Sequence, residues 1–316
     1  MSARVSVIIP VYNGAALVAQ AIDSALAQSL PPLEVIVVDD GSTDGTAALL
    51  AGYGKRIRTV RIAHGGVSRA RNAGLAASRG ELLAFLDADD VWHPHKLARQ
   101  AAALGVWPQA GLCCCDYLVQ HRHHGCKVSH FAGALPLAGL APQRPLVNLP
   151  LAALVRCNFI GTASNVMLRR SVAQQAGGFD TRLRQAEDYD YWLRCARQGP
   201  FVLLPAPLME KRSHGANLTA NALETAQCHE QVLLKWQHSG VLPASAAVLL
   251  PAALSRVRYC IARQWSLRGR AGKALHYCLH GWRSEPTAAN SRRALRTLAR
   301  CTLHLLSPRP CGTAPG

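Results

Sequence analysis

The chain has 316 residues, 49% of them hydrophobic, a composition that supports a folded core and excludes a wholly disordered protein. No uncharged apolar run reaches the roughly 18 residues that a membrane span requires, and the N-terminus lacks a signal-peptide pattern, so we expect a cytoplasmic protein. The net charge of +17 is uneven: from residue 241 onward, twelve Lys and Arg accompany one acid, Glu285. This excess of positive charge indicates an anionic partner, either a membrane surface or a nucleic acid.

The eleven cysteines do not form the pattern of a disulfide scaffold. Their number is odd, three of them are consecutive at 113–115, and no Cys-x-x-Cys pair occurs in the chain. In a chain of this length, that usage predicts reduced thiols, several of them buried.

The first ninety residues alternate between apolar runs and helical stripes. Residues 5–10 and 33–38 have the composition of buried strands, and apolar residues lie at helical spacing between them. Further strands are expected at 57–62 and 82–86, with a basic helix between them. Strand–helix–strand units of this size predict an α/β domain with a parallel sheet and right-handed crossovers.

Carboxylates follow two of these strands directly. Asp40 comes after the second, and Asp87, Asp89 and Asp90 come after the fourth. Open α/β sheets bind ligands at the carboxyl ends of their strands, and Asp87 and Asp89 have the two-residue period that lets them share a divalent cation. The alternative is an acidic exit from the strand, in which Asp90 caps the next helix.

Two further features can bind a nucleotide. The carboxylate of Asp40 can hydrogen-bond a base or ribose, and Arg69 and Arg71, next to a glycine turn, can meet phosphate. The alternatives are an Asx-type turn for Asp40 and a solvated helix face for the two arginines.

Four motifs occur in one order along the chain: Val-Ser-Val-Ile-Ile-Pro-Val-Tyr-Asn at 5–13, Val-Asp-Asp-Gly-Ser-Thr-Asp-Gly-Thr at 38–46, Ser-Arg-Ala-Arg-Asn-Ala-Gly at 68–74 and Leu-Asp-Ala-Asp-Asp at 86–90. Together they closely resemble the family 2 glycosyltransferases, over about residues 4 to 218. The resemblance implies the GT-A fold, which is Rossmann-like with a mostly parallel central sheet flanked by helices, and a nucleotide-diphosphate sugar as donor.

The same resemblance assigns roles around the donor. It implies that Pro10 and Tyr12 line the base pocket and that Asp40 hydrogen-bonds the base. Asp87 reaches the ribose or the metal, and Asp89 ligates the Mn²⁺ or Mg²⁺ ion that bridges the diphosphate. The chemistry agrees, because such an ion neutralises the charge of a departing diphosphate.

The middle of the chain is less informative. Residues 110–117 and 163–170 are expected to be strands, and residues 132–150, rich in Gly and Pro, are expected to form a loop over the cleft. The His- and Cys-containing stretch 121–130 matches no common zinc spacing and is interpreted as an exposed polar loop.

Residues 186–194 form the second chemical element. Acidic residues favour the first turn of a helix, so Glu187 and Asp188 can be purely structural. The resemblance instead implies that Asp188 is the general base that deprotonates the acceptor hydroxyl, with Glu187 orienting the acceptor. Trp192 can pack against a sugar or in the core, and Asp190 and Arg194 are expected to form a helix-surface pair.

Residues 211–219 resemble the closing segment of the family, in which Arg212 and His214 approach the diphosphate and exclude water. Beyond residue 220 the sequence predicts Ala- and Leu-rich helices. The last of them, within 288–316, is basic and amphipathic. It can lie on an anionic bilayer or pack on the catalytic domain.

These observations predict a GT-A domain with a C-terminal helical extension. We expect a nucleotide-sugar-binding half at 1–110, an acceptor and catalytic-base half at 111–220, and a basic helical extension at 221–316. The predicted function is inverting, metal-dependent transfer of one sugar, with UDP-sugar as the first candidate donor, to a hydroxyl acceptor on a lipid-linked glycan in bacterial surface polysaccharide (O-antigen, capsule or exopolysaccharide) biosynthesis. The expected location is cytoplasmic, peripheral on the inner face of the membrane. The alternatives are a sugar-nucleotide pyrophosphorylase and a basic nucleic-acid-binding protein.

Overall fold

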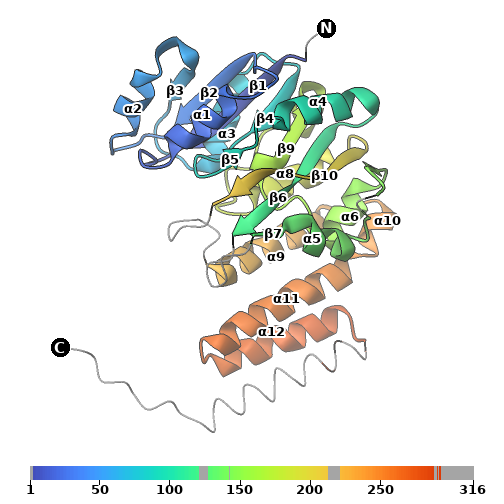
Figure 1. Cartoon of the computed structure of the whole chain (residues 1–316). Helices are drawn as coiled ribbons and strands as arrows, with labels where there is room; N and C mark the ends of the chain where they lie inside the picture. Colours follow the sequence, from blue (N-terminus) through green and yellow to red (C-terminus); the bar gives the residue numbers. More distant parts are fainter. Residues whose placement is uncertain are drawn as a thin grey trace, which may run out of the picture. The chain divides into compact units, whose positions relative to one another are not determined.

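The computed structural model describes residues 3–120, 127–141, 143–212, 221–287, 290 and 292. The chain divides into two compact units, which we call unit 1 (Met1–Asn217) and unit 2 (Leu218–Gly316). Unit 1 is α/β and the described part of unit 2 is helical (Figure 1). The predicted α/β class with a helical extension after residue 220 is thus confirmed.

The sheet of unit 1 begins with four parallel neighbours in the order β3-β2-β1-β4. The apolar runs of β1, β2 and β4 are buried on both faces, as parallel strands covered by helices require, whereas the edge strand β3 is mostly exposed. The sheet continues through β9, β6, β10 and β5, in which β6 and β10 are parallel and the other pairs are antiparallel. The bounds are β1 (Val5–Val11), β2 (Glu34–Asp39), β3 (Arg58–Arg61), β4 (Leu82–Phe85), β5 (Val91–Trp92), β6 (Leu112–Gln120), β7 (Lys127–Ser129), β8 (Leu146–Val147), β9 (Val166–Arg169) and β10 (Phe201–Lys211).

Alternate residues of the central strands pack on two different helices. Val7 and Ile9 of β1 share one core cluster with α1 (Val18–Leu26). On β2, Ile36 packs instead with Ala70 of α3 (Val67–Ala77). Helix α3 also lies close to β1, because a Cβ added at Gly74 would come within 2.3 Å of Ile8 Cγ2. The central strands are therefore covered on both faces and expose only their ends.

The remaining helices of unit 1 are α2 (Thr46–Gly52), η1 (Gly54–Arg56), α4 (Lys96–Val106), α5 (His130–Ala138), α6 (Pro150–Arg156), η2 (Ala163–Asn165), α7 (Arg170–Ala176) and α8 (Glu187–Cys195). Two local predictions were wrong. Residues 132–150 are not one loop, because Ser129 caps α5 by accepting the N–H of Ala132. Residues 163–165 are helical rather than strand, because Thr162 caps that turn through the N–H of Ser164.

Strand β6 carries the three consecutive cysteines. Cys113, Cys114 and Cys115 are free, fully buried thiols, which confirms that part of the prediction. Burial raises the pKa of all three, that of Cys115 to about 11, so they stay protonated at neutral pH.

A fully buried lysine lies at the start of α4. Lys96 Nζ donates a hydrogen bond to Gln100 Oε1 at 2.7 Å and lies 4.1 Å from the centroid of the Trp92 ring. Burial lowers the pKa of Lys96 to about 8, because removal from water disfavours the charged ammonium.

Unit 2 contains α9 (Ala222–Ser239), α10 (Ala244–Ala247), α11 (Leu250–Leu267) and α12 (Ala271–Ser284). Helices α11 and α12 lie side by side (Figure 1), and Leu254 and Ile261 are buried in the α11 interface with its neighbours. The segment Ala244–Leu267 is long and apolar enough to cross a membrane, but this is weak evidence, because core helices satisfy the same criterion. The predicted amphipathic helix within 288–316 lies outside the described residues, apart from Asn290 and Arg292.

Candidate active site

Three carboxylates follow β4 in a tight turn. The N–H of Asp90 donates to the carbonyl of Asp87 at 3.0 Å, and the N–H of Asp87 donates to Ser164 Oγ at 2.9 Å. Asp90 is buried, and burial raises its pKa to about 8, with the charges of Asp87 and Asp89 adding to the rise. The turn therefore brings three acidic side chains close together, and one of them, Asp90, is removed from water.

Arg71 joins this turn to the start of α8. Its guanidinium is buried, with 3% of the residue exposed, and donates to Asp87 Oδ1 at 2.7 Å and to Glu187 Oε1 at 2.6 Å. The Glu-Asp pair at 187–188 and the carboxylates after β4 are about a hundred positions apart in sequence, yet they share one cation. Arg71 is thus not the solvated side chain of the alternative interpretation, whereas Arg69 is exposed.

The two carboxylates respond differently to that cation. Burial alone would raise the pKa of Asp87, but the guanidinium of Arg71 holds it below its usual value. Burial raises the pKa of Glu187 to about 7, and the adjacent charge of Asp188 opposes the effect of Arg71. Arg71 therefore keeps Asp87 ionised, while Glu187 titrates near neutral pH.

The start of α8 presents the second carboxylate of the pair. Asp188 is half-buried, and its Oδ1 accepts the N–H of Tyr189 at 2.7 Å. The residue before the helix, Ala186, has a φ of 59°, a left-handed conformation that is strained for a residue with a Cβ. Glu187 and Asp188 therefore both belong to the first turn of α8, directly after this strained residue.

The rest of α8 is structural. Asp190 and Arg194 form the predicted i,i+4 ion pair at 3.0 Å, but it is not a surface pair, because Asp190 is fully buried. Arg194 also donates to the carbonyls of Ala176 and Gly178. Trp192 is fully buried against Phe85 and Phe179, so it packs in the core.

The exits of β1 and β2 hold the residues predicted to bind the base. The Asp40 carboxylate is buried and accepts the N–H groups of Gly65 and Gly66 at 2.9 and 2.8 Å. His64 Nδ1 lies 3.0 Å from Asp40 Oδ2, and the His64 ring stacks on Tyr12 with centroids 4.0 Å apart.

Two more residues of the predicted base pocket have distinct environments. Tyr12 is exposed, whereas Pro10 is buried within β1 opposite Val38. The strand also continues one residue past Pro10, to Val11, rather than ending there. The roles of these residues toward a base stay predictions.

The end of β10 lies against the acidic turn. Arg212 Nε donates to the carbonyl of Asp89 at 2.6 Å, and the Arg212 N–H donates to Asp90 Oδ1 at 3.3 Å. The ammonium of Lys211 acts in the same place, lowering the pKa of Asp87 and opposing the rise at Asp90. His214, the other residue predicted from this segment, lies outside the described residues.

Sequence reasoning missed the residues that hold the acidic turn. Ser164 accepts the Asp87 N–H, Thr162 Oγ1 lies 3.4 Å from Asp87 Oδ2, and Trp92 Nε1 donates to the Ser164 carbonyl at 2.7 Å. Lys211 was also given no role. The available signal was the run of polar residues Thr162, Ser164 and Asn165 after Gly161, directly before an apolar strand.

A divalent cation fits this arrangement only together with a ligand. Within the described residues, no group of three or more His, Cys, Asp or Glu side chains is placed to hold a metal. Asp87 and Asp89 offer two carboxylates at most, and Mg²⁺-type ions are commonly held by one or two carboxylates plus substrate phosphates. Burial is the main cause of the raised pKa of Asp90, and the neighbouring charges of Asp87 and Asp89, which add to it, are what a cation would neutralise.

Comparisons of sequence agree with these motifs. The family model described as "Glycosyl transferase family 2" matches residues 6–129, and that of "Glycosyl transferase family group 2" matches residues 82–232. An uncharacterised glycosyltransferase of Rickettsia prowazekii is 30% identical over 233 residues, which cover 73% of this chain and 70% of the relative. Another, from Rickettsia typhi, is 31% identical over 231 residues, covering 72% and 70%.

Comparisons of structure give the same fold. S. aureus TarS has a TM-score of 0.67 at 15% identity, covering 95% of this chain and 55% of TarS. Its residues 1–349 in complex with UDP give 0.65 at 15% identity, covering 99% and 94%. The mannosyltransferase PcManGT of Pyrobaculum calidifontis, solved with GDP-Man and Mn²⁺, gives 0.63 at 20% identity, covering 97% and 88%. The chain therefore has the GT-A fold and belongs to glycosyl transferase family 2.

Proposed function

We propose that this glycosyltransferase moves one sugar from a nucleotide-diphosphate sugar to a hydroxyl acceptor in a single displacement that inverts the anomeric centre. The observation that carries the proposal is the pair of hydrogen bonds from Arg71 to Asp87 and Glu187. These bonds connect Asp87, which would help hold the cation that binds the donor diphosphate, to Glu187, which would face the acceptor. Family membership favours this transfer over the alternatives of a pyrophosphorylase and a nucleic-acid-binding protein.

The donor is proposed to lie along the exits of β1, β2 and β4. The exposed ring of Tyr12 offers a stacking surface for the base, and the polar exit of β2 lies beside it. Arg212 is already tied to the turn that holds Asp89, so it lies at the diphosphate end. The proposed donor-binding residues are Pro10, Tyr12, Asp40, Arg71, Asp87, Arg212 and His214.

Asp87 and Asp89 are the residues proposed to hold a divalent cation. When bound, Mn²⁺ or Mg²⁺ would neutralise the charge that develops on the leaving diphosphate. Thr162 and Ser164 keep the turn in one geometry, and Lys211 and Arg212 supply further positive charge beside it.

Asp188 is the proposed general base. It is half-buried, lies in the first turn of α8, which fixes its backbone, and neighbours Glu187, which Arg71 anchors. Asp188 would take the proton of the acceptor hydroxyl as the oxygen attacks the sugar from the side opposite the diphosphate, which gives inversion. Glu187 would orient the acceptor, and its pKa of about 7 lets it accept or donate a hydrogen bond.

The proposed setting is bacterial surface polysaccharide (O-antigen, capsule or exopolysaccharide) biosynthesis, in the cytoplasm and at the inner face of the membrane. UDP-sugar is the first donor to test, since TarS was solved with UDP and with UDP-GlcNAc. The basic helices of unit 2 are the proposed contact with an anionic membrane, and a lipid-linked glycan is the proposed acceptor.

The decisive experiment is a panel of nucleotide sugars with Mn²⁺ or Mg²⁺, scored by release of the nucleotide diphosphate. Asp89→Ala is expected to abolish release of the nucleotide diphosphate, both by hydrolysis of the donor and by transfer of the sugar to an acceptor. Asp188→Asn should lower transfer to an acceptor by roughly a hundred- to ten-thousand-fold, because it removes the base while keeping the size of the side chain. Equal turnover by wild type and both variants would refute the proposed site.

A further inference from the structure

One tyrosine of unit 1 has a buried ring and a hydroxyl without a partner. Tyr117 belongs to β6, and only 3% of the residue is exposed. Among the described residues, none forms a hydrogen bond with its hydroxyl. The Tyr191 hydroxyl also lacks a partner in the described part of the chain, but it is completely enclosed by protein atoms, whereas that of Tyr117 is not. Because buried tyrosine hydroxyls normally find a hydrogen-bond partner, the hydroxyl of Tyr117 is available to a ligand.

The Tyr117 hydroxyl lies against a glycine beside the acidic turn. A Cβ added at Gly161 would come within 2.5 Å of Tyr117 Oη and within 2.8 Å of His130 Nε2. Gly161 has a φ of 76°, which favours glycine, so this position stays free of a side chain. The next residue, Thr162, places its Oγ1 atom 3.4 Å from Asp87 Oδ2. The hydroxyl therefore contacts the segment that also contacts the acidic turn.

The register of the sheet places Tyr117 at the same end as this turn. Glu210 of β10 pairs with Leu118 of β6 on one side and with Val91 of β5 on the other. Tyr117 and Asp90 directly precede these two partners in the sequence. Both residues therefore lie within one position of the same rung of the sheet.

Carboxylates of both proposed catalytic motifs act on this hydroxyl. Burial raises the pKa of Tyr117, and the charges of Asp90, Asp188 and Asp116 add to the rise. The hydroxyl therefore stays protonated at neutral pH and can donate a hydrogen bond. Asp90 belongs to the turn proposed to hold the cation, and Asp188 is the proposed base, so Tyr117 lies near both sides of the proposed reaction.

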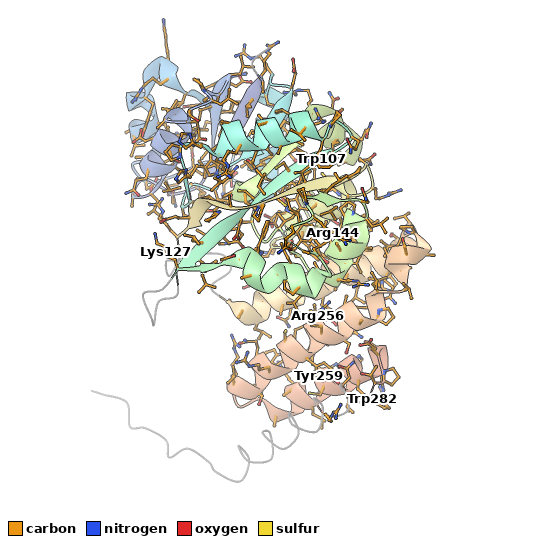
Figure 2. All side chains as sticks on the ribbon, turned by 45° about the vertical axis from the view of Figure 1, so that its right-hand side comes forward. Trp107, Lys127, Arg144, Arg256, Tyr259 and Trp282 are labelled. Carbon is orange, nitrogen blue, oxygen red and sulfur yellow. The ribbon has the colours of Figure 1, made fainter. Side chains whose placement is uncertain are left out.

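Helix α5 holds the ring in place. His130, its first residue, stacks on Tyr117 with ring centroids 4.4 Å apart and 14° between the planes, and His130 Nε2 donates to the carbonyl of Phe159 at 3.0 Å. Burial lowers the pKa of His130, so its ring is neutral at neutral pH. Strand β7, whose first residue Lys127 is labelled in Figure 2, pairs with the end of β6 and leads directly into α5. The Tyr117 ring is therefore oriented before any ligand binds.

We propose that the Tyr117 hydroxyl donates a hydrogen bond to a hydroxyl oxygen of the transferred sugar and so helps to select the donor sugar. This inference rests on the proposed function, in which the sugar passes from a diphosphate beside Asp89 to an acceptor oxygen beside Asp188. The sugar ring must then lie between these two carboxylates, and the Tyr117 hydroxyl is close enough to both motifs for their charges to act on it. A site that hydrogen-bonds a substrate hydroxyl discriminates against an analogue that lacks it.

The test is isothermal titration of the full chain, with Mn²⁺, against UDP-glucose, UDP-galactose, UDP-N-acetylglucosamine and GDP-mannose, each compared with UDP or GDP alone. Tyr117→Phe should bind UDP and GDP as wild type does, because the hydroxyl faces the sugar and not the nucleotide. It should bind the preferred nucleotide sugar about three- to tenfold more weakly, as expected for the loss of one hydrogen bond. Unchanged affinity for that nucleotide sugar would overturn the proposal.

Tyr191→Phe is the matched control. It also removes an unpaired hydroxyl from a buried ring, but this hydroxyl is enclosed in the core. The control should leave the affinities for all of these ligands unchanged, and thermal denaturation checks that both variants fold. Equal weakening of nucleotide-sugar binding by Tyr117→Phe and Tyr191→Phe would assign the effect to core packing and overturn the sugar contact.

Kinetic measurements separate this inference from the proposed function. Tyr117→Phe should slow hydrolysis of the donor without acceptor as well as transfer to an acceptor, because both reactions use the same sugar. Slowing of transfer alone would assign the hydroxyl to the acceptor and overturn the proposal. Unimpaired transfer by Asp188→Asn would refute the proposed base alone, whereas unchanged donor affinity of Tyr117→Phe would refute the sugar contact alone.

Discussion

The acidic site of unit 1 and helix α12 of unit 2 hold their charged side chains in opposite ways. In unit 1, Arg71 is almost fully buried and makes two short ion pairs, and Asp90 is buried beside other carboxylates. On α12 of unit 2, Lys273 and Arg283 are exposed and the helix has no acid. Buried charges must be paired in one geometry, which is what stabilising charge in a transition state requires. Exposed charges need little desolvation and suit recognition of a surface.

The largest expected effect tests the buried side of this contrast. Arg71→Met leaves Asp87 and Glu187 without their shared cation, and it should lower the free energy of unfolding by about 3–5 kcal/mol, measured by urea denaturation. Arg69→Met, on the exposed face of the same helix, should change it by less than about 0.5 kcal/mol.

A double variant sharpens that test. Adding Glu187→Gln to Arg71→Met removes one of the two stranded charges, so it should recover part of the lost stability. If Arg71→Met cost no more than Arg69→Met, the ion pairs would not be what joins the two motifs.

The second effect concerns Lys96. Its pKa is about 8 in the folded protein against an ordinary 10.5, so the unfolded chain binds more protons between these values. Stability should therefore rise as pH increases from about 8 to 10.5, by about 3 kcal/mol. Lys96→Met removes this dependence, so its stability advantage over wild type should be largest below pH 8 and shrink above it. Lys55→Met is the exposed control, and a parallel pH dependence in both variants would contradict the assignment.

The third effect separates two arginines of unit 2. Arg258 Nε donates to Glu230 Oε1 at 2.6 Å and Nη1 donates to Ser284 Oγ at 2.6 Å, which ties together α9, α11 and α12. Arg258→Gln should cost about 2 kcal/mol of unfolding free energy. Arg283→Gln, at an exposed site of α12, should cost less than about 0.5 kcal/mol. If thermal denaturation showed similar losses of stability for Arg258→Gln and Arg283→Gln, the hydrogen bonds of Arg258 would not be what stabilises this unit.

The smallest effect is a gain. Ala186 is held at a φ of 59° just before Glu187, and Gly adopts that conformation without a Cβ clash. Ala186→Gly should therefore raise the unfolding free energy by about 1 kcal/mol. Ala102 is a solvent-exposed residue in the middle of α4. Ala102→Gly should lower the unfolding free energy by a similar amount, because there glycine only adds conformational freedom to the unfolded chain. A loss at both sites would show that the turn before α8 is not strained.

The strands and their acidic ends could be predicted because their signals are local. An apolar run followed at once by Asp87 and Asp89 indicates both the strand and the chemistry at its end. The partner of Arg71 could not be found this way, since Glu187 lies 116 positions further along and no periodicity relates the two. Thr162 and Ser164 were missed for the same reason, as their function depends on the strand beside them.

Two other features escaped prediction for different reasons. Helix α5 forms in a Gly- and Pro-containing stretch because Asp116 accepts the N–H of Phe131 and Ser129 caps the first turn. The contact of Lys273 in α12 with the ring of Trp265 in α11 joins two helices whose sequences contain no recognisable motif. Only the three-dimensional packing brings Lys273 and Trp265 together.

The three buried cysteines of β6 provide a practical tool. Because burial keeps Cys113, Cys114 and Cys115 protonated and inaccessible, maleimide and similar reagents should not modify them in the native fold. Opening of the β6 region would release all three at once. The kinetics of their alkylation, followed by mass spectrometry, would therefore time the opening of the catalytic sheet without the introduction of a new cysteine.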